Sequence, residues 1–154
     1  MKRLLLTLAY RLYELKCRLT RPIVVGVRIL LIEDGSVVLV RHTYQPAWFL
    51  PGGAVKRGET LAEAAMREAY EEVGARLSQP PALLGLYANL AGGKSDHIAV
   101  FASHAFALGP APDRWEIAQV GRFGLGSLPA DVSRGTQRRV ADYLAGCAPH
   151  SGHW

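Results

Sequence analysis

Hydrophobic positions near the start of the chain follow the pattern of β-strands. Residues 23–32 read IVVGVRILLI, a β-branched and mostly apolar run that is typical of a buried strand. Asp34 and Gly35 form a turn signal, and a second apolar run, SVVLVRH, follows at residues 36–42. The pattern therefore predicts a β-hairpin over residues 23–42.

A helical pattern takes over at residues 60–73. Thr60 is a residue type that begins helices well, and Glu63 stands three positions later, which is the spacing of a capping box. Gly74 follows the last periodic position, where glycine commonly ends a helix. We therefore expect a helix whose two ends are both specified by local residues.

The rest of the chain alternates strand and helix signals. Residues 83–90 and 97–108 each predict a strand, residues 115–125 predict another, and Ser133 caps a last predicted helix. Residues 147–154 show no periodic pattern, so we expect a loose tail there. Because hairpins interrupt a regular alternation of strands and helices, the pattern favours a mixed sheet with helices on its faces.

Residues 1–21 differ in character from the remainder. Their leucines recur at helical spacing among basic residues, which predicts an amphipathic helix. The apolar run is too short to cross a bilayer, and no small-residue cleavage site follows it. Two interpretations stay open: packing on the domain or on a second copy in a homodimer, or attachment to an anionic membrane surface or a polyanion. The leucines are Leu4, Leu8, Leu12, Leu15 and Leu19.

Composition supports one globular domain, which we place at residues 22–146 of the 154. The net charge of +5 belongs entirely to residues 1–21, since the remainder has twelve basic and twelve acidic residues. This balance argues against a basic nucleic-acid-binding face across the domain. Cys17 and Cys147 are too few for a disulfide framework and lack zinc-site spacing, so we expect a reducing, cytoplasmic setting.

The predicted helix at residues 60–73 carries closely spaced carboxylates. Glu68, Glu71 and Glu72 share one face, within about 100° of arc, and like charges at such spacing destabilise a helix by a few tenths of a kcal/mol. Glu59 can reach back over the first turn from just before the helix. Magnesium prefers oxygen ligands and often joins a few carboxylates to phosphates, so a cation would neutralise the cluster.

The order of these residues resembles the Nudix box of the Nudix hydrolase family. Residues 53–75 read glycine, five residues, Glu59, seven residues and then REAYEEVGA. Every charged and glycine position of the box is filled at the right spacing. Ala69 and Ala75 depart from it, because they stand where the family usually has larger aliphatic side chains. With WFLPGG before the box and WEIAQVGRF after it, the resemblance covers roughly residues 22–146.

The resemblance implies an α/β/α sandwich that uses Mg²⁺ or Mn²⁺ to hydrolyse a nucleoside diphosphate linked to another group. Water would attack phosphorus and split a pyrophosphate bond. Arg67 would orient a carboxylate of the cluster. The implied metal ligands are the carbonyl of Gly52 and the carboxylates of Glu59, Glu68, Glu71 and Glu72.

Other polar residues are candidates for the general base or for substrate contacts. Glu68 is our first choice for the base, and Glu116 and Asp96 are candidates outside the box. Arg41 and His42 lie at the end of a predicted strand, where arginine suits phosphate binding; either residue can equally be a solvated edge residue. Glu116 is also a candidate for substrate binding, against the alternative of a surface ion pair.

Aromatic and histidine residues receive weaker assignments. Trp48 and Tyr87 can stack on a base, although such residues more often belong to the core. His97 and His104 alternate with apolar residues and lack metal-ligand spacing, so we interpret both as structural. The loops expected to select the substrate are at residues 43–47, 88–96 and 109–115.

Three functional interpretations remain at this point. The first is a metal-dependent hydrolase of a nucleoside diphosphate linked to another moiety, as in ADP-ribose or a nucleoside triphosphate. The second is a related hydrolase of RNA 5′ ends or of a non-nucleotide pyrophosphate. The third is a non-catalytic ligand sensor on the same fold, which we disfavour because no carboxylate of the box is lost.

Overall fold

A computed structural model describes residues 22–90, 95–112, 115–146 and 150–154. Only isolated positions within residues 1–21 are described, so the predicted amphipathic helix lies mostly outside the described residues. Both cysteines also lie outside them. In the part that is described, no helix is long and apolar enough to cross a membrane.

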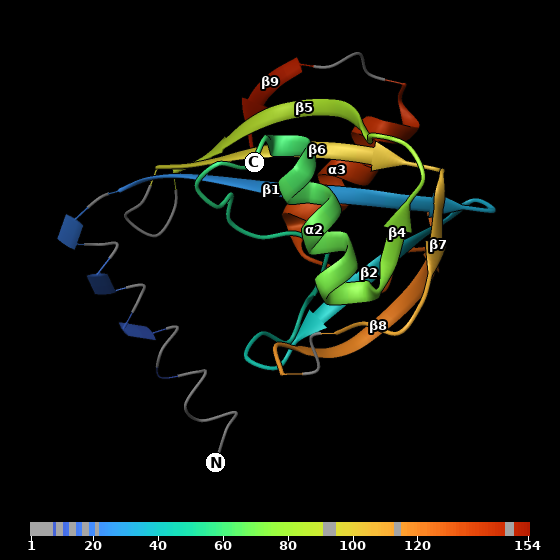
Figure 1. The fold of residues 1–154 in the computed structure, drawn as a ribbon, viewed down its shortest axis with the longest axis horizontal. Helices are drawn as coiled ribbons and strands as arrows, with labels where there is room; N and C mark the ends of the chain where they lie inside the picture. Colours follow the sequence, from blue (N-terminus) through green and yellow to red (C-terminus); the bar gives the residue numbers. More distant parts are fainter. Residues whose placement is uncertain are drawn as a thin grey trace.

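The main sheet is mixed, as the sequence pattern predicts (Figure 1). β1 and β2 form the expected antiparallel hairpin, while β1 runs parallel to β6 on its other side. The strand order is β3-β2-β1-β6-β5-β9, with β8 also paired to β2. The strands are β1 Ile23–Glu33, β2 Ser36–His42, β3 Trp48–Phe49, β4 Ala75–Leu77, β5 Ala82–Asn89, β6 Ser95–Ser103, β7 Phe106–Leu108, β8 Ile117–Gly124 and β9 His150–His153.

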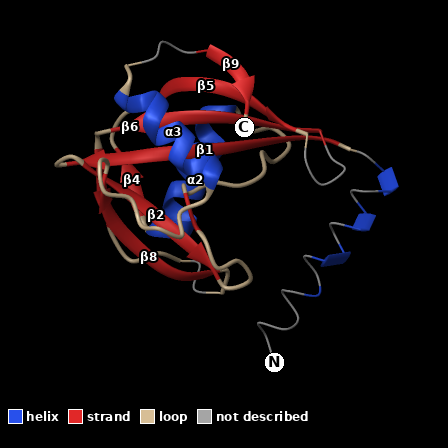
Figure 2. Ribbon diagram, turned by 180° about the vertical axis from the view of Figure 1, so that it is seen from behind, coloured by secondary structure: helices blue, strands red, loops and turns tan. Residues whose placement is uncertain are grey.

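Two helices cover opposite faces of this sheet (Figures 1 and 2). α2, Leu61–Val73, packs its alanines and Val73 against Val27, Ile29 and other residues of one core cluster. α3, Arg134–Leu144, contributes Val140 to a second cluster on the other face. Successive strand residues point to opposite faces, so the apolar run of β1 supplies both cores. The expected α/β/α arrangement is therefore confirmed.

α2 begins and ends as the local residues predict. Thr60 caps the helix: its side chain accepts from the Glu63 amide at 3.2 Å, and Glu63 Oε2 accepts from the Thr60 amide at 2.8 Å. Gly74 ends it in the left-handed conformation, with φ of 69°. The capping role assigned to Glu63 is thus confirmed, which separates this glutamate from the others nearby.

The segment before α2 lies against the edge of β1. The amides of Val27 and Ile29 donate to the carbonyls of Gly53 and Pro51, over 2.9 and 3.0 Å. β1 thus pairs with β2 only near the hairpin turn, whereas the first half of β1 is hydrogen-bonded to residues 50–55. This places the Gly-Gly turn and the start of α2 beside the middle of the sheet.

One apolar run that predicts a single strand divides into two. Within residues 97–108, β6 ends at Ser103, and β7 pairs with β4 in a separate two-stranded sheet. The Ser103 hydroxyl accepts from the Ala105 amide, which stabilises the bend between the two strands. Both halves are apolar, so the hydrophobic pattern alone cannot show that the chain changes sheets.

The predicted loose tail is wrong for residues 150–154, while residues 147–149 lie outside the described residues. β9 adds a parallel strand to the edge of β5, and the Trp154 amide donates to the Ala88 carbonyl at 3.0 Å. The Trp154 ring meets Tyr87 edge-on, with centroids 6.2 Å apart, and lies over Gly135 of α3. The sequence pattern misses β9 because a polar edge strand is held mainly by backbone hydrogen bonds.

Candidate functional site

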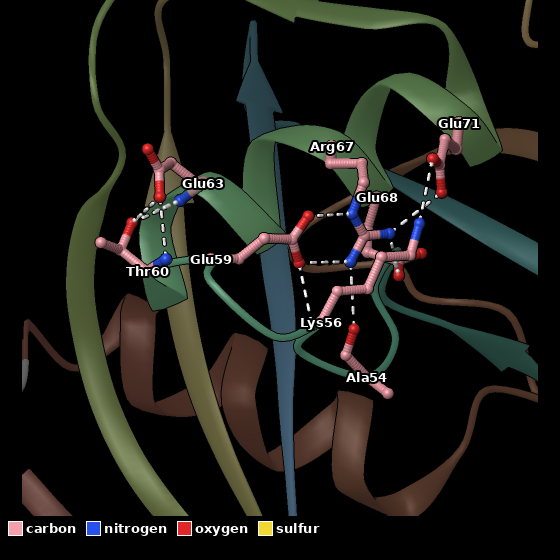
Figure 3. Close-up of polar contacts among 8 residues, drawn as sticks. All are labelled: Ala54, Lys56, Glu59, Thr60, Glu63, Arg67, Glu68 and Glu71. Atoms are coloured by element: carbon pink, nitrogen blue, oxygen red, sulfur yellow. Dashed lines mark hydrogen bonds and ion pairs between the residues drawn. The ribbon is translucent and has the colours of Figure 1, made fainter.

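Arg67 is the centre of the carboxylate cluster (Figure 3). Its Nε and Nη2 bind the two oxygens of Glu59 at 2.6 and 2.9 Å, which is a bidentate pair. Nη1 binds Glu68 at 2.6 Å and Glu71 at 3.0 Å, and Nη2 also donates to the Ala54 carbonyl at 3.0 Å. The predicted orienting role was for one carboxylate, whereas the guanidinium contacts three.

These contacts offset part of the negative charge at the start and along one face of the helix. Hydrogen bonds from Arg67 and from the Lys56 amide lower the pKa of Glu59 to about 2, so its carboxylate stays ionised at neutral pH. In turn, the hydrogen bonds to Glu59, which has the largest effect, and to Glu68 and Glu71 raise the pKa of Arg67 above its ordinary value. Lys56 adds a longer contact to Glu71, at 3.6 Å. Arg67 and Lys56 therefore balance part of the charge of the three carboxylates, and a net negative charge remains.

Within the described ranges, no three acidic, histidine or cysteine side chains gather closely enough to hold a metal ion as they stand. Arg67 contacts Glu59, Glu68 and Glu71 at once, so a metal ion would have to replace some of these contacts. The donor chemistry nevertheless fits a hard divalent cation, since every candidate ligand is an oxygen. The backbone also accommodates Glu68: a Cβ added to Gly53 would lie 2.6 Å from Glu68 Oε1.

Glu72 occupies a different environment from the other box glutamates. Its side chain faces inward, the residue is only 5% exposed, and Oε2 accepts from the Gly52 amide at 2.9 Å. Burial raises the pKa of Glu72 to about 8; Glu68 and Glu116 add to the rise, while Arg28 and the Gly52 amide oppose it. A buried carboxylate of this kind favours a cation or a proton as its partner.

This raised pKa predicts a pH dependence of the metal-free protein. The Glu72 pKa is about 8 in the folded state against 4.5 for an ordinary glutamate, so the folded state binds the proton more tightly. The contribution of protonated Glu72 to the free energy of unfolding is therefore largest below about pH 4.5 and is lost as pH rises through about 8. Urea unfolding in EDTA across this range should show stability falling more steeply for wild type than for Glu72→Gln. Parallel profiles would contradict the assignment.

Arg28 is a site residue that the sequence pattern did not single out. It is half-buried in the apolar β1, and its Nη1 donates to the carbonyls of Leu50, at 3.3 Å, and Gly52. The guanidinium also lowers the pKa of Glu72 through its charge. One signal was available in the sequence, since a lone arginine inside a buried strand needs polar partners.

Glu116 and Tyr44 bring two distant loops to the same place. The Tyr44 hydroxyl donates to Glu116 Oε1 at 2.6 Å, and the Thr43 amide donates to the Glu116 carbonyl at 2.9 Å. Burial and the contact with Glu116 raise the pKa of Tyr44. Tyr44 and Glu116 thus join the loop at residues 43–47 to the start of β8, and the charge of Glu116 adds to the rise in the pKa of Glu72. The sequence pattern missed Tyr44.

Arg41 and His42 lie side by side but have different surroundings. Arg41 forms an ion pair with Asp131 and stacks over Trp48, 4.6 Å from the ring centroid. His42 is buried and stacks on Tyr44, with ring centroids 5.2 Å apart. Both residues line a cavity of about 380 Å³, whose remaining lining is Thr43, Gln45, Pro46, Ala118 and Gln119.

The remaining candidates divide between core and loop positions. Trp48 and Tyr87 are buried in the core beneath α3, so neither is exposed for stacking on a base. Asp96 lines a small cavity of about 110 Å³ that also borders Arg28. His97 contacts Ser95 at 3.2 Å, and the His104 ring meets the Tyr143 hydroxyl at 3.1 Å.

Comparison of the sequence with models of known protein families identifies the family of this chain. A family model described as the NUDIX domain matches residues 20–143. The chain belongs to the NUDIX family. This NUDIX chain is therefore a hydrolase of pyrophosphate bonds, and the Nudix box at residues 53–75 is its defining segment.

Curated relatives of this NUDIX chain carry several activities in their names. A putative 8-oxo-dGTP diphosphatase of Bacillus subtilis (strain 168) is 32% identical over 123 residues, which is 77% of each chain. An RNA pyrophosphohydrolase of Baumannia cicadellinicola is 44% identical over 43 residues, covering 28% of this chain and 27% of its own length. The first match spans the domain, whereas the second covers only a short stretch.

Solved structures support the same fold. The MutT NUDIX hydrolase from Burkholderia pseudomallei superposes with a TM-score of 0.70 at 28% identity, covering 79% of this chain and 97% of its own. An ADP-ribose pyrophosphatase from Streptococcus suis gives a TM-score of 0.59 at 16% identity, covering 83% and 98%. The second likeness shows the fold alone.

Proposed function

We propose that the protein hydrolyses a nucleoside diphosphate linked to another moiety, and that it requires Mg²⁺ or Mn²⁺. The observation that carries this proposal is the complete box, whose glutamates surround Arg67 and the Gly-Gly turn on one face of α2. A sensor that had lost catalysis would have no need to retain every one of these carboxylates.

The metal would be held by the carboxylates that contact Arg67, by the buried carboxylate of Glu72 and by the Gly52 carbonyl. The bound ion would neutralise the substrate phosphates and stabilise charge in the transition state. Arg67 binds Glu59 through two nitrogens, whereas its third nitrogen is shared between Glu68 and Glu71. Glu68 and Glu71 are therefore the carboxylates that would exchange their contact with Arg67 for the metal ion. The proposed ligands are Gly52, Glu59, Glu68, Glu71 and Glu72.

We assign the general base to Glu68. It lies against Gly53 and is bound by Arg67 at 2.6 Å, which fixes its direction. Glu116 is the weaker candidate, because its carboxylate accepts from the Tyr44 hydroxyl at 2.6 Å and is thereby tied to the loop at residues 43–47. Glu116 and Tyr44 instead suit a substrate-binding role, since their contact joins the loop at residues 43–47 to the start of β8.

Arg41 and His42 are proposed to contact the substrate. Support comes from the 380 Å³ cavity that they line beside the loop at residues 43–47, where substrate selection is expected. Its size lies within the range of small-molecule sites, about 300–1,000 Å³. A phosphate contact by Arg41 requires that it exchange its ion pair with Asp131.

Nucleoside triphosphates are the first substrates to test within the proposed class. The relative that spans the domain is named an 8-oxo-dGTP diphosphatase, whereas the RNA pyrophosphohydrolases match only short stretches. Purified protein should be assayed against nucleoside triphosphates, 8-oxo-dGTP, ADP-ribose, nucleotide sugars and 5′-triphosphorylated RNA, with Mg²⁺ and with EDTA. Magnesium-dependent release of a nucleoside monophosphate supports the proposal. Turnover of RNA alone would favour the second interpretation.

Residues 1–21 are proposed to mediate association in the cytoplasm, with a second copy or with an anionic membrane surface. Four leucines of this segment, Leu8, Leu12, Leu15 and Leu19, are each more than half exposed, and the segment holds the whole net charge. Deletion of residues 1–21 should reduce sedimentation with anionic vesicles, or convert a dimer to a monomer, while turnover of a soluble substrate stays unchanged. Loss of turnover would instead place the segment in the active site or the core.

A further inference from the structure

Residues 50–53, which lie along the edge of β1, have four consecutive carbonyl groups that accept hydrogen bonds from residues of β1. The second and fourth accept hydrogen bonds from backbone amides of β1, as in an ordinary sheet. The first and third, on Leu50 and Gly52, both accept from Nη1 of the Arg28 side chain. A single guanidinium nitrogen therefore binds the two carbonyls, those of Leu50 and Gly52, that accept no hydrogen bond from a backbone amide of β1.

We propose that Arg28 is a positioning residue that directs the Gly52 carbonyl toward the divalent ion. The inference rests on the proposed function, in which this carbonyl is a metal ligand. A carbonyl oxygen has two lone pairs, so one can accept from Arg28 while the other faces the ion. Groups that orient metal ligands typically contribute about 10–100-fold in metal affinity or activity.

The surroundings of Arg28 make it a rigid support. Its backbone pairs with Val100 of β6 on one side, while the segment 50–55 lies on the other, so the strand cannot easily shift. On the turn itself, Glu72 accepts from the Gly52 amide at 2.9 Å. Gly52 is thus held at its amide by Glu72 and at its carbonyl by Arg28, and both contacts converge on the proposed metal face.

The charge of Arg28 allows positioning to be separated from electrostatics. A cation beside the site repels a metal ion, so removing it would by charge alone strengthen metal binding. If Arg28 positions the Gly52 carbonyl, removing it should weaken binding instead. The two explanations therefore predict opposite signs for the same substitution.

The test is direct Mn²⁺ binding to the full chain without substrate, measured by electron paramagnetic resonance of the free ion. We expect Arg28→Met to weaken Mn²⁺ binding by about 10-fold or more, with circular dichroism and urea unfolding confirming that it is folded. Arg28→Lys should recover most of the affinity, because one nitrogen makes both contacts. Arg122→Met is the matched control: it removes an exposed ion pair with Glu33 and the same charge, and should leave Mn²⁺ affinity unchanged.

Including Glu72→Gln in the same experiment keeps the two proposals distinguishable. If Glu72→Gln loses Mn²⁺ but Arg28→Met binds it as wild type does, or more tightly, Arg28 has no positioning role and the proposed site stands. If wild type binds no Mn²⁺, the metal-dependent function and this inference both fail. If Arg28→Met is unfolded, Arg28→Gln, which also removes the charge, decides: weaker Mn²⁺ binding than wild type supports positioning, and equal or tighter binding overturns it.

Discussion

Glu72→Gln and Glu71→Gln are each expected to lower magnesium-dependent turnover by more than about 100-fold, since outer groups around a metal alone cost about 10–100-fold. Both side chains are proposed ligands, and an amide lacks the charge that holds a hard cation. Glutamine is close in shape to glutamate, and at position 72 it can still accept from the Gly52 amide. The variants should therefore remain folded, which circular dichroism can verify.

Glu63→Gln is the matched control on the same helix. Glu63 closes the capping box with Thr60, and glutamine also serves in such boxes. Steady-state kinetics should show this variant close to wild type, so a general effect of lost helix charge is separated from loss of a ligand. Wild-type turnover in both Glu71→Gln and Glu72→Gln would rule out the proposed site.

Gly52→Ala is expected to destabilise the fold by about 3 kcal/mol or more. Gly52 has φ of 143°, a region costing other residues about 1–3 kcal/mol. A Cβ there would also collide with the Val27 carbonyl and lie 2.9 Å from the Arg28 Cα. Both obstacles are backbone atoms of β1, so the turn must separate from the strand and lose hydrogen bonds worth about 1 kcal/mol each. Urea unfolding measures this loss directly.

Gly53→Ala should behave differently, although the two glycines are neighbours. A Cβ at Gly53 would meet the Glu68 carboxylate, which is the end of a flexible side chain that can move aside. We expect stability near that of wild type and turnover lowered by the displacement of Glu68. Gly126→Ala is the control, because a Cβ there meets nothing within 4 Å. Equal losses of stability in Gly52→Ala and Gly53→Ala would contradict this division.

The local features of the chain were predictable because neighbouring residues determine them. Thr60, Glu63 and Gly74 specify the two ends of α2 through contacts within a few positions. The hairpin of β1 and β2 follows from two apolar runs and the turn between them. The spacing of the Nudix box likewise places its glutamates on one helix face, whatever surrounds that helix.

Features that join distant parts of the chain were not predictable from periodicity. β9 is a short polar strand, and its partner β5 lies more than 60 positions away in the sequence. The contact between Tyr44 and Glu116 depends on two loops that only the sheet brings together. Such pairings depend on backbone geometry and on which sheet edge has unpaired backbone groups, and the pattern of neighbouring residues indicates neither.

The sequence by itself determined which family this protein belongs to and which helix face carries its acids. Only the tertiary structure decided how those acids are balanced: Arg67 holds Glu59, Glu68 and Glu71, while Glu72 turns inward to the Gly52 amide. It also brought Arg28 from β1 beneath the same turn. The physical reason is that spacing sets direction on a helix, whereas burial and charge pairing depend on what the fold packs against it.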